Sequence, residues 1–149
     1  MRAVVQRVSR ASVEVSGGTV VRAGRGLLVL AALHRDDTDT DLDYIARKIV
    51  GLRVFEDAAG VMNCSLEDVK GDLLLVSQFT LYGDARKGKR PSYGEAMPPD
   101  RASARFHEFV ALCKTLWPRV ETGVFGAHMM LDLVNDGPVT ILLDSRRLF

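Results

Sequence analysis

The sequence predicts an α+β fold of largely antiparallel β-sheets packed with two main helices. Short apolar runs bounded by glycine, proline or aspartate recur along the chain, which is typical of strands. Only two stretches, Leu42–Leu52 and Arg101–Leu116, carry apolar side chains at helical spacing. The length of 149 residues and the 47% apolar content fit one globular domain over residues 1–149.

The first third of the chain reads as strands joined by glycine turns. Residues 3–8, in which four apolar side chains accompany Gln6 and Arg7, are expected to form a strand. Residues 11–16 alternate between apolar and polar side chains. Gly17-Gly18 is a hairpin signal before a return strand over residues 19–22. Leu27–Leu33 is continuously apolar, so we expect a central strand that is covered on both faces.

Two helices are expected. The first follows the aspartate-rich stretch Asp36–Asp43, which we interpret as a capped helix start. It lacks the glycine and closing glutamate of a calcium loop. The second helix runs over Arg101–Leu116, with Asp100 as its cap and Trp117-Pro118 as its end. Between them, residues 53–55 read as a short strand and residues 62–65 as irregular chain.

A second buried strand, Leu73–Val76, leads into Ser77-Gln78-Phe79-Thr80-Leu81. This polar pentad is either plain strand or a site at a strand end, where sites tend to open. A threonine nucleophile at Thr80 needs a base, and the pentad contains no histidine, lysine or acid. The histidines are scattered without triad or ligand spacing, so structural or solvated roles are expected for His34, His107 and His128.

Four cations in five residues follow: Arg86, Lys87, Lys89 and Arg90. Two glycines and a tyrosine lie nearby, which suits a loop that binds phosphates. A solvated charged loop that binds nothing fits the same residues equally well.

The stretch Val134–Thr140 contains Asp136-Gly137-Pro138 between two apolar runs, Met129–Val134 and Val139–Leu143. An ordinary hairpin turn between two strands is one interpretation. The other is a pair of backbone carbonyls that face a pocket, because Gly137 has no Cβ and lets a ligand approach the main chain. These residues alone leave the isomer of the bond before Pro138 open.

Composition excludes several classes of function. A net charge of +1 gives no overall attraction to nucleic acid or membrane, so any RNA contact must be local. Cys64 and Cys113 are far apart and are expected to be reduced thiols, with no metal and no cofactor site. The N-terminal residues lack an apolar signal segment, and no apolar run approaches about 18 residues, so a cytoplasmic protein without membrane contact is expected.

Two distant segments carry a resemblance to a known family. Ser77-Gln78-Phe79-Thr80-Leu81 and Asn135-Asp136-Gly137-Pro138-Val139-Thr140 are similar to the two signature motifs of the D-aminoacyl-tRNA deacylase family. Further similarity runs through residues 1–8, 87–92 and 123–127, and it covers essentially the whole chain.

The resemblance implies a homodimer whose strands meet at the interface and whose substrate is the aminoacylated 3′ end of tRNA. It implies hydrolysis of the ester between a D-amino acid and the terminal adenosine, with glycyl-tRNA as a second substrate. Gly137 and Pro138, joined by a cis bond, would reach the partner's pocket and reject L-amino acids. Ser77, Gln78, Phe79 and Thr80 would shape the oxyanion side, and the tRNA 2′-hydroxyl would help to activate water.

In this interpretation Arg86, Lys87, Lys89 and Arg90 would contact the acceptor stem. Two alternatives stay open at this point. One is an inactive dimeric RNA-binding accessory module on the same scaffold. The other is an esterase that uses Thr80 as its nucleophile and acts on small esters.

Overall fold

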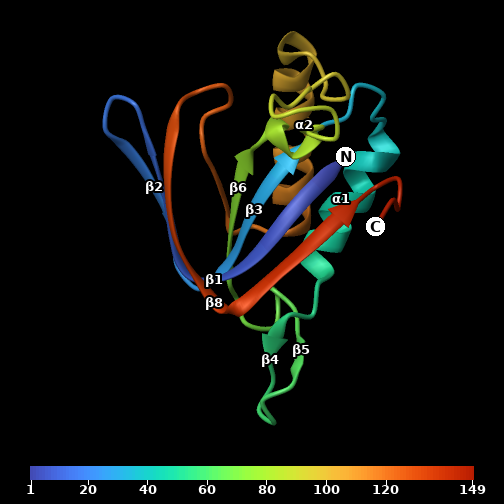
Figure 1. The fold of residues 1–149 in the computed structure, drawn as a ribbon. Helices are drawn as coiled ribbons and strands as arrows, with labels where there is room; N and C mark the ends of the chain where they lie inside the picture. The colour runs from blue at the N-terminus through green and yellow to red at the C-terminus, as the bar shows by residue number, and fades with distance from the viewer.

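The structure is a computed structural model that describes residues Met1–Phe149. It contains a six-stranded sheet, a separate two-stranded hairpin and two α-helices (Figure 1). The strands of the main sheet are β1 (Arg2–Val15), β2 (Thr19–Ala23), β3 (Gly26–Ala32), β6 (Asp72–Ser77), β7 (Val120–Thr122) and β8 (Met129–Asp144). The helices are α1 (Asp39–Gly51) and α2 (Pro99–Leu116), the hairpin joins β4 (Phe55–Glu56) to β5 (Met62–Cys64), and a 3₁₀ turn spans Phe79–Tyr82.

Strand β1 organises the sheet because it pairs along both of its edges. Its first half pairs antiparallel with β3, and its second half pairs antiparallel with β2. Along its other edge, β8 pairs antiparallel with both halves. The two strands expected over residues 3–8 and 11–16 are therefore one continuous strand of 14 residues.

Antiparallel pairing predominates in the sheet, as predicted from sequence, because β1 pairs antiparallel with β2, β3 and β8. The sheet is nevertheless mixed, since two of its ladders are parallel. β3 pairs with β6, and β6 with β7, in parallel. Parallel neighbours need a crossover of a dozen or more residues. The chain provides one through α1 between β3 and β6, and another through α2 between β6 and β7. Apolar spacing located both helices but carried no information on strand direction.

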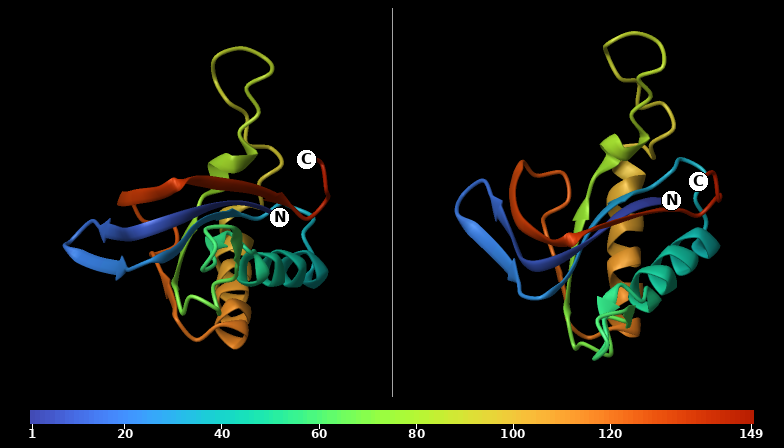
Figure 2. Two further views of the ribbon diagram at one scale, coloured as in Figure 1. Left: turned by 90° about the horizontal axis from the view of Figure 1, so that it is seen from below. Right: turned by 60° about the horizontal axis from the view of Figure 1, so that its bottom comes forward.

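Both helices cover the same face of the sheet (Figure 2). Leu27, Val29 and Ala31 of β3 join the core beneath the helices, together with Phe109 of α2. Leu28 faces the other way into a second core, which the curled β1, β2 and β8 enclose. β3 is therefore buried on both faces, which confirms the expectation from its continuous apolar run.

Of the two interpretations of Asp136-Gly137-Pro138, the hairpin turn is wrong. Met129–Asp144 is a single strand, and both of its halves pair with β1 in the same direction. The register shifts where Val8 pairs with Asn135 and Gln6 pairs with Thr140. The intervening residues of β8 therefore bulge out of the ladder and return to it, whereas a hairpin would reverse the chain.

Smaller differences concern element boundaries. α2 begins at Pro99 with Pro98 as its cap, so Asp100 lies in the first turn and is not the cap. Proline suits this place because the first helical N–H groups have no partner within the helix. β4, Phe55–Glu56, begins two residues later than the expected strand and ends one residue later. Met62–Cys64, expected to be irregular, pairs with it as β5. Neither helix is long and apolar enough to cross a membrane.

Candidate functional site

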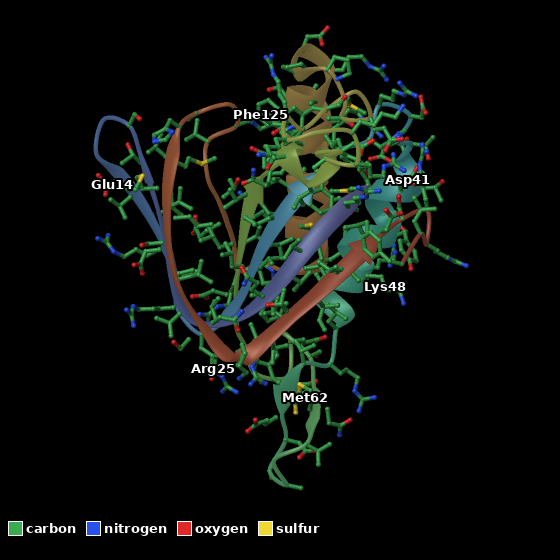
Figure 3. All side chains as sticks on the ribbon, viewed as in Figure 1. Glu14, Arg25, Asp41, Lys48, Met62 and Phe125 are labelled. Atoms are coloured by element: carbon green, nitrogen blue, oxygen red, sulfur yellow. The ribbon has the colours of Figure 1, made fainter.

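A cavity of about 680 Å³ opens at the carboxyl ends of the parallel strands. β3 and β6 end beside it, and the chain that follows β7 closes it. Carboxyl ends of parallel strands are a common place for ligands, because the chain leaves the sheet there in different directions. Phe125, which lines the cavity, lies beside α2 in Figure 3. Arg25 lies far from it, at the opposite end of the sheet. The lining residues are mostly apolar and include Ala31–Leu33, Val76–Phe79, Tyr93, Ala96–Pro99, Ala102, Phe106, Phe125–Met129 and Leu131.

The predicted pentad forms one wall of this cavity. Ser77 ends β6, and the N–H of Gln78 donates to the carbonyl of Ala31 at 2.8 Å. The chain then turns into the 3₁₀ helix Phe79–Tyr82, so the plain-strand interpretation of the pentad is wrong. The first N–H groups of a helical turn have no partner within it. The amides of Phe79 and Thr80 donate none of the turn and loop hydrogen bonds, which leaves them available to a ligand.

Side chains of the pentad lie at the mouth of the cavity. Phe79 is 56% exposed and packs edge-on against Tyr93, with ring centroids 5.1 Å apart. The side-chain amide of Gln78 donates to the hydroxyl of Thr80. Ser77, Gln78 and Phe79 line the cavity, whereas Thr80 is exposed beside it.

Few titratable groups line the cavity. Only Tyr93 and His128 do so, and none of the lining residues is an aspartate, glutamate, lysine or cysteine. His34 lies elsewhere, buried in an edge contact with Tyr82, so of the two roles expected for it, solvated or structural, it has the structural one. Burial raises the pKa of the Cys113 thiol to about 12, which makes that cysteine a poor nucleophile.

Sequence reasoning missed the residues that close the cavity. Phe106 and Phe125 pack with ring centroids 5.9 Å apart, and both line it. Phe106 was expected on the core face of α2, where it is indeed buried. The glycines around Phe125 indicated that the backbone passes close to another part of the protein. No local signal showed that Phe125 packs against Phe106 of α2.

Gly137 and Pro138 form an exposed step in the bulge of β8. Their peptide bond is cis, the isomer that the resemblance implies. Gly137 has φ of +137°, and a Cβ there would lie 2.7 Å from Cγ2 of Val139. The side chain of Asn135 accepts from the N–H of Val139 at 2.8 Å, which closes the bulge.

Arg7 supports the bulge from beneath, and sequence reasoning missed this role. Its side chain is only 7% exposed, and its Nε donates to the carbonyl of Asp136 at 2.9 Å. Its Nη1 donates to the carbonyl of Val54 at 2.7 Å. Alternation would have revealed it, because Arg7 lies in step with the buried Ala3 and Val5.

Within one chain the two motifs lie apart. Neither Gly137 nor Pro138 lines the cavity. β3 serves as a common reference for the two motifs. The bulge lies opposite Arg7, which pairs with Leu27 of β3. Ser77 pairs with Ala31, four residues further along β3. At the rise of a strand this is about 13 Å along the sheet, and β1 and β3 also lie between the motifs. No single protomer therefore brings Gly137 and Pro138 to its own pentad.

The basic loop extends from the sheet next to Tyr93. Arg86, Lys87 and Arg90 line a polar hollow of about 650 Å³ together with Asp84 and Ser92. Arg86 is already paired, since its Nη2 lies 2.7 Å from Oδ2 of Asp84, and this guanidinium holds the pKa of the Asp84 carboxyl well below its usual range. Lys87, Lys89 and Arg90 are exposed and have no ion-pair partner in the chain.

Comparisons with known proteins cover nearly all or all of the chain. Residues 4–144 match the family model described as D-Tyr-tRNA(Tyr) deacylase. Relatives named D-aminoacyl-tRNA deacylase are 58% identical in Thermosipho africanus and 57% identical in Thermotoga petrophila, in each case over 149 residues and all of both chains. A solved structure described as "c-Myc DNA Unwinding Element Binding Protein" superposes with a TM-score of 0.91 at 42% identity, covering 97% of this chain and 98% of that one. The chain therefore belongs to the D-Tyr-tRNA(Tyr) deacylase family.

Proposed function

We propose that this protein hydrolyses the ester bond of D-aminoacyl-tRNA and releases the free D-amino acid and tRNA. The observation that carries the proposal is the cavity walled by Ser77–Phe79, in a chain 58% identical over its full length to a relative named D-aminoacyl-tRNA deacylase. A volume of about 680 Å³ suits a ligand the size of an aminoacylated adenosine. Because tRNA is charged in the cytoplasm, that is where we place the activity.

The chemistry requires little from side chains. An aminoacyl ester is already activated, so water can attack it once the developing oxyanion is stabilised. The unpaired amides of Phe79 and Thr80 are the donors we assign to that oxyanion. The cavity wall offers no carboxylate or lysine as a base. Its one histidine, His128, is exposed at the cavity and is not the base that we assign. Our candidate for assisting the attacking water is the 2′-hydroxyl of the terminal adenosine.

A covalent mechanism through Thr80 is disfavoured by its surroundings. Its hydroxyl accepts a hydrogen bond from the Gln78 amide, which is not a base. Replacing Thr80 with alanine should therefore leave most of the turnover intact. Loss of turnover in Thr80→Ala, together with an acyl-enzyme trapped on the wild type, would establish the nucleophile instead.

Rejection of L-amino acids is assigned to the main chain of Gly137 and Pro138. Carbonyls there can accept from the substrate ammonium and occupy the space that an L side chain needs. Glycine has no side chain to exclude, so glycyl-tRNA is a second expected substrate. Because these residues lie outside the cavity of their own chain, we propose a homodimer in which each copy presents them to the other's pocket.

Release of amino acid from D-tyrosyl-tRNA and L-tyrosyl-tRNA tests the activity directly. We expect rapid release from the D substrate and almost none from the L substrate. Release of neither would favour the alternative, a nucleic-acid-binding module without activity on the same scaffold. Equal release of both would remove the chiral filter and leave only an esterase.

Mixing two impaired variants tests the shared site. Gly137→Ala alters the segment that one copy donates, and Phe79→Ala alters the pocket that accepts it. After joint unfolding and refolding, a mixed dimer has one pocket that is normal on both sides, so part of the activity should return. If the site were built within one chain, every chain would keep a defect and mixing would restore nothing. Sedimentation of the wild type checks that the dimer exists.

A further inference from the structure

The far end of the Phe79–Tyr82 turn is held by an arginine from the opposite end of the chain. Arg2 lies at the start of β1, and its Nη1 donates to the carbonyl of Leu81 at 3.2 Å. Its guanidinium carbon also lies 4.5 Å from the ring centroid of the buried Tyr82. Arg2 thus contacts two consecutive residues of the turn, one by a hydrogen bond and one by stacking over a ring.

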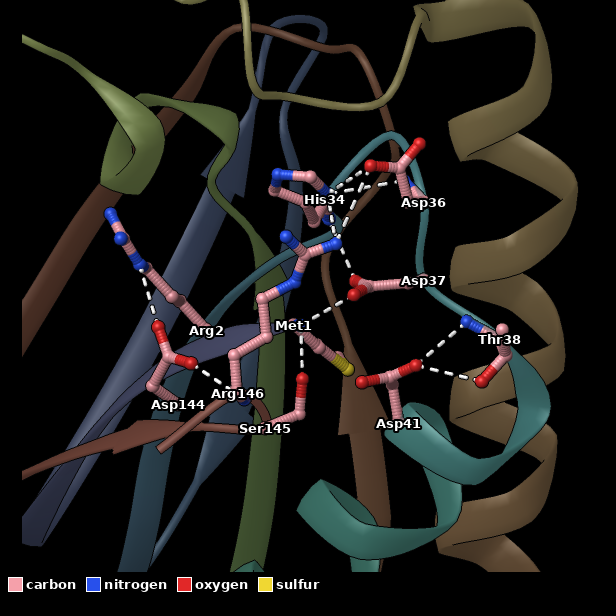
Figure 4. A network of polar contacts seen from close by, with 10 residues as sticks. All are labelled: Met1, Arg2, His34, Asp36, Asp37, Thr38, Asp41, Asp144, Ser145 and Arg146. Atoms are coloured by element: carbon pink, nitrogen blue, oxygen red, sulfur yellow. Dashed lines mark hydrogen bonds and ion pairs between the residues drawn. The ribbon is translucent and has the colours of Figure 1, made fainter. Parts of the chain in front are cut away.

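Arg2 is itself held in place. Its Nε lies 2.9 Å from Oδ2 of Asp144, a carboxylate that is only 2% exposed (Figure 4). The other oxygen of Asp144 accepts from the N–H of Arg146 at 2.7 Å. Because both oxygens of the acid are committed, the guanidinium has a fixed direction, unlike an arginine in a surface ion pair.

Besides the ring contacts of Phe79 with Tyr93 and of Tyr82 with His34, the turn is restrained by few backbone hydrogen bonds. Its start is tied to β3 through the 2.8 Å bond from the Gln78 N–H to Ala31. Within it, the N–H of Leu81 donates to Gln78 at 3.2 Å, and the N–H of Gly83 donates to Thr80 at 2.9 Å. Hydrogen bonds of a 3₁₀ turn have poor geometry and resist distortion weakly. The direction of the amides at Phe79 and Thr80 therefore depends on both anchors, β3 at one end and Arg2 at the other.

We propose that Arg2 is a positioning residue, which holds the Phe79 and Thr80 amides in the direction that the reaction uses. This inference rests on the proposed function as far as turnover is concerned. The fork of a guanidinium is required, because one nitrogen serves Asp144 while another serves Leu81. A lysine keeps the charge but cannot hold both partners in this geometry.

Kinetics of Arg2→Ala and Arg2→Lys test the role in turnover. Misdirected oxyanion donors affect the transition state more than substrate binding, so kcat should fall roughly tenfold to a hundredfold in both variants, with KM nearly unchanged. Arg10→Ala is the matched control, an exposed arginine on the same strand, and it should behave as wild type. An unchanged kcat would overturn the proposal. A loss that lies wholly in KM would also overturn it and would indicate a direct contact with tRNA instead.

Amide hydrogen exchange gives a readout that does not need activity. In Arg2→Ala, the Leu81 and Gly83 amides should exchange at least about tenfold faster than in wild type, while Val29 in β3 keeps its rate. Unchanged exchange at Leu81 and Gly83 would overturn the proposal whatever the kinetics. If the wild type releases no D-amino acid, the proposed function fails, and this exchange measurement alone decides the role of Arg2.

Discussion

The Nε atom of Arg7 lies 2.9 Å from the carbonyl oxygen of Asp136, the residue before the Gly137–Pro138 step. The same guanidinium donates to the carbonyl of Val54 at 2.7 Å, so one buried side chain joins β1, the bulge of β8 and the start of the β4–β5 hairpin. Its charge is largely shielded from water, because the side chain is only 7% exposed. The shape of the bulge is therefore set by a residue more than a hundred positions away in sequence.

Replacing Arg7 with methionine should lower the free energy of unfolding by about 2–4 kcal/mol, because two carbonyls lose a charged donor. Urea unfolding measures this loss. Arg10→Met removes an exposed arginine from the same strand and should cost less than about 0.5 kcal/mol. Similar values for the two variants would mean that Arg7 does not stabilise the bulge.

Replacing Gly137 with alanine should cost about 1–3 kcal/mol of unfolding free energy, because φ of +137° is unfavourable for an L residue and the new Cβ meets Val139 and Arg7. Gly18→Ala is the matched control, since φ of +91° is also positive there but nothing lies within 4 Å. We expect a smaller cost at Gly18 and an unchanged ratio of D to L hydrolysis. Equal costs would show that the contacts at Gly137 add nothing to the backbone term.

Protonation of His34 should destabilise the fold at mildly acidic pH. Burial first, and then the Arg146 guanidinium, lower the pKa of His34 below its ordinary value of 6.5. Its Nδ1 lies 3.1 Å from the N–H of Asp36 and 2.9 Å from Nη2 of Arg146, both of which are donors, so the ring acts there as a neutral acceptor. His34 binds a proton more readily in the unfolded chain than in the folded one, so neutral His34 stabilises the fold. That stabilisation is complete above pH 6.5 and is lost as the pH falls below it.

Urea midpoints measured from about pH 7.5 down to about pH 5.5 check this expectation. The wild type should lose stability across that range, and His34→Gln should lose less. His107→Gln, on the exposed face of α2, should keep the wild-type dependence. If His34→Gln followed the wild-type curve, another group would be responsible.

Neutralising the basic loop should weaken tRNA binding and reduce its dependence on salt. A plot of log affinity against log salt falls with a steepness that grows with the number of phosphate contacts. Lys87→Gln, Lys89→Gln and Arg90→Gln should each make this slope shallower by about one, as expected for a lost phosphate contact. Arg86→Gln should have a smaller effect, because Arg86 is already paired with Asp84. An unchanged slope in the triple variant would remove the loop from the RNA site.

Local sequence patterns were sufficient for much of this fold. Both helices and the buried strands β3 and β6 follow from the spacing of apolar residues, because that spacing records which side of the chain faces the core. The pentad Ser77–Leu81 was located at a strand end by the change from apolar to polar residues, and a strand end is where the structure has it. The four cations of residues 86–90 were likewise visible as a charged loop.

The tertiary structure decided what depends on distant partners. Asp136-Gly137-Pro138 has the composition of a hairpin turn, yet β1 pairs on both sides of it and makes it a bulge. Arg2 and Arg7 read as ordinary polar residues of a strand until the folded chain supplies Leu81 and Asp136 as their acceptors. Strand direction, the closure of the cavity and the distance between the two motifs were undetermined by sequence for the same reason. A residue's own neighbours determine its local conformation, but which acceptor a guanidinium meets is decided only when strands far apart in sequence pair.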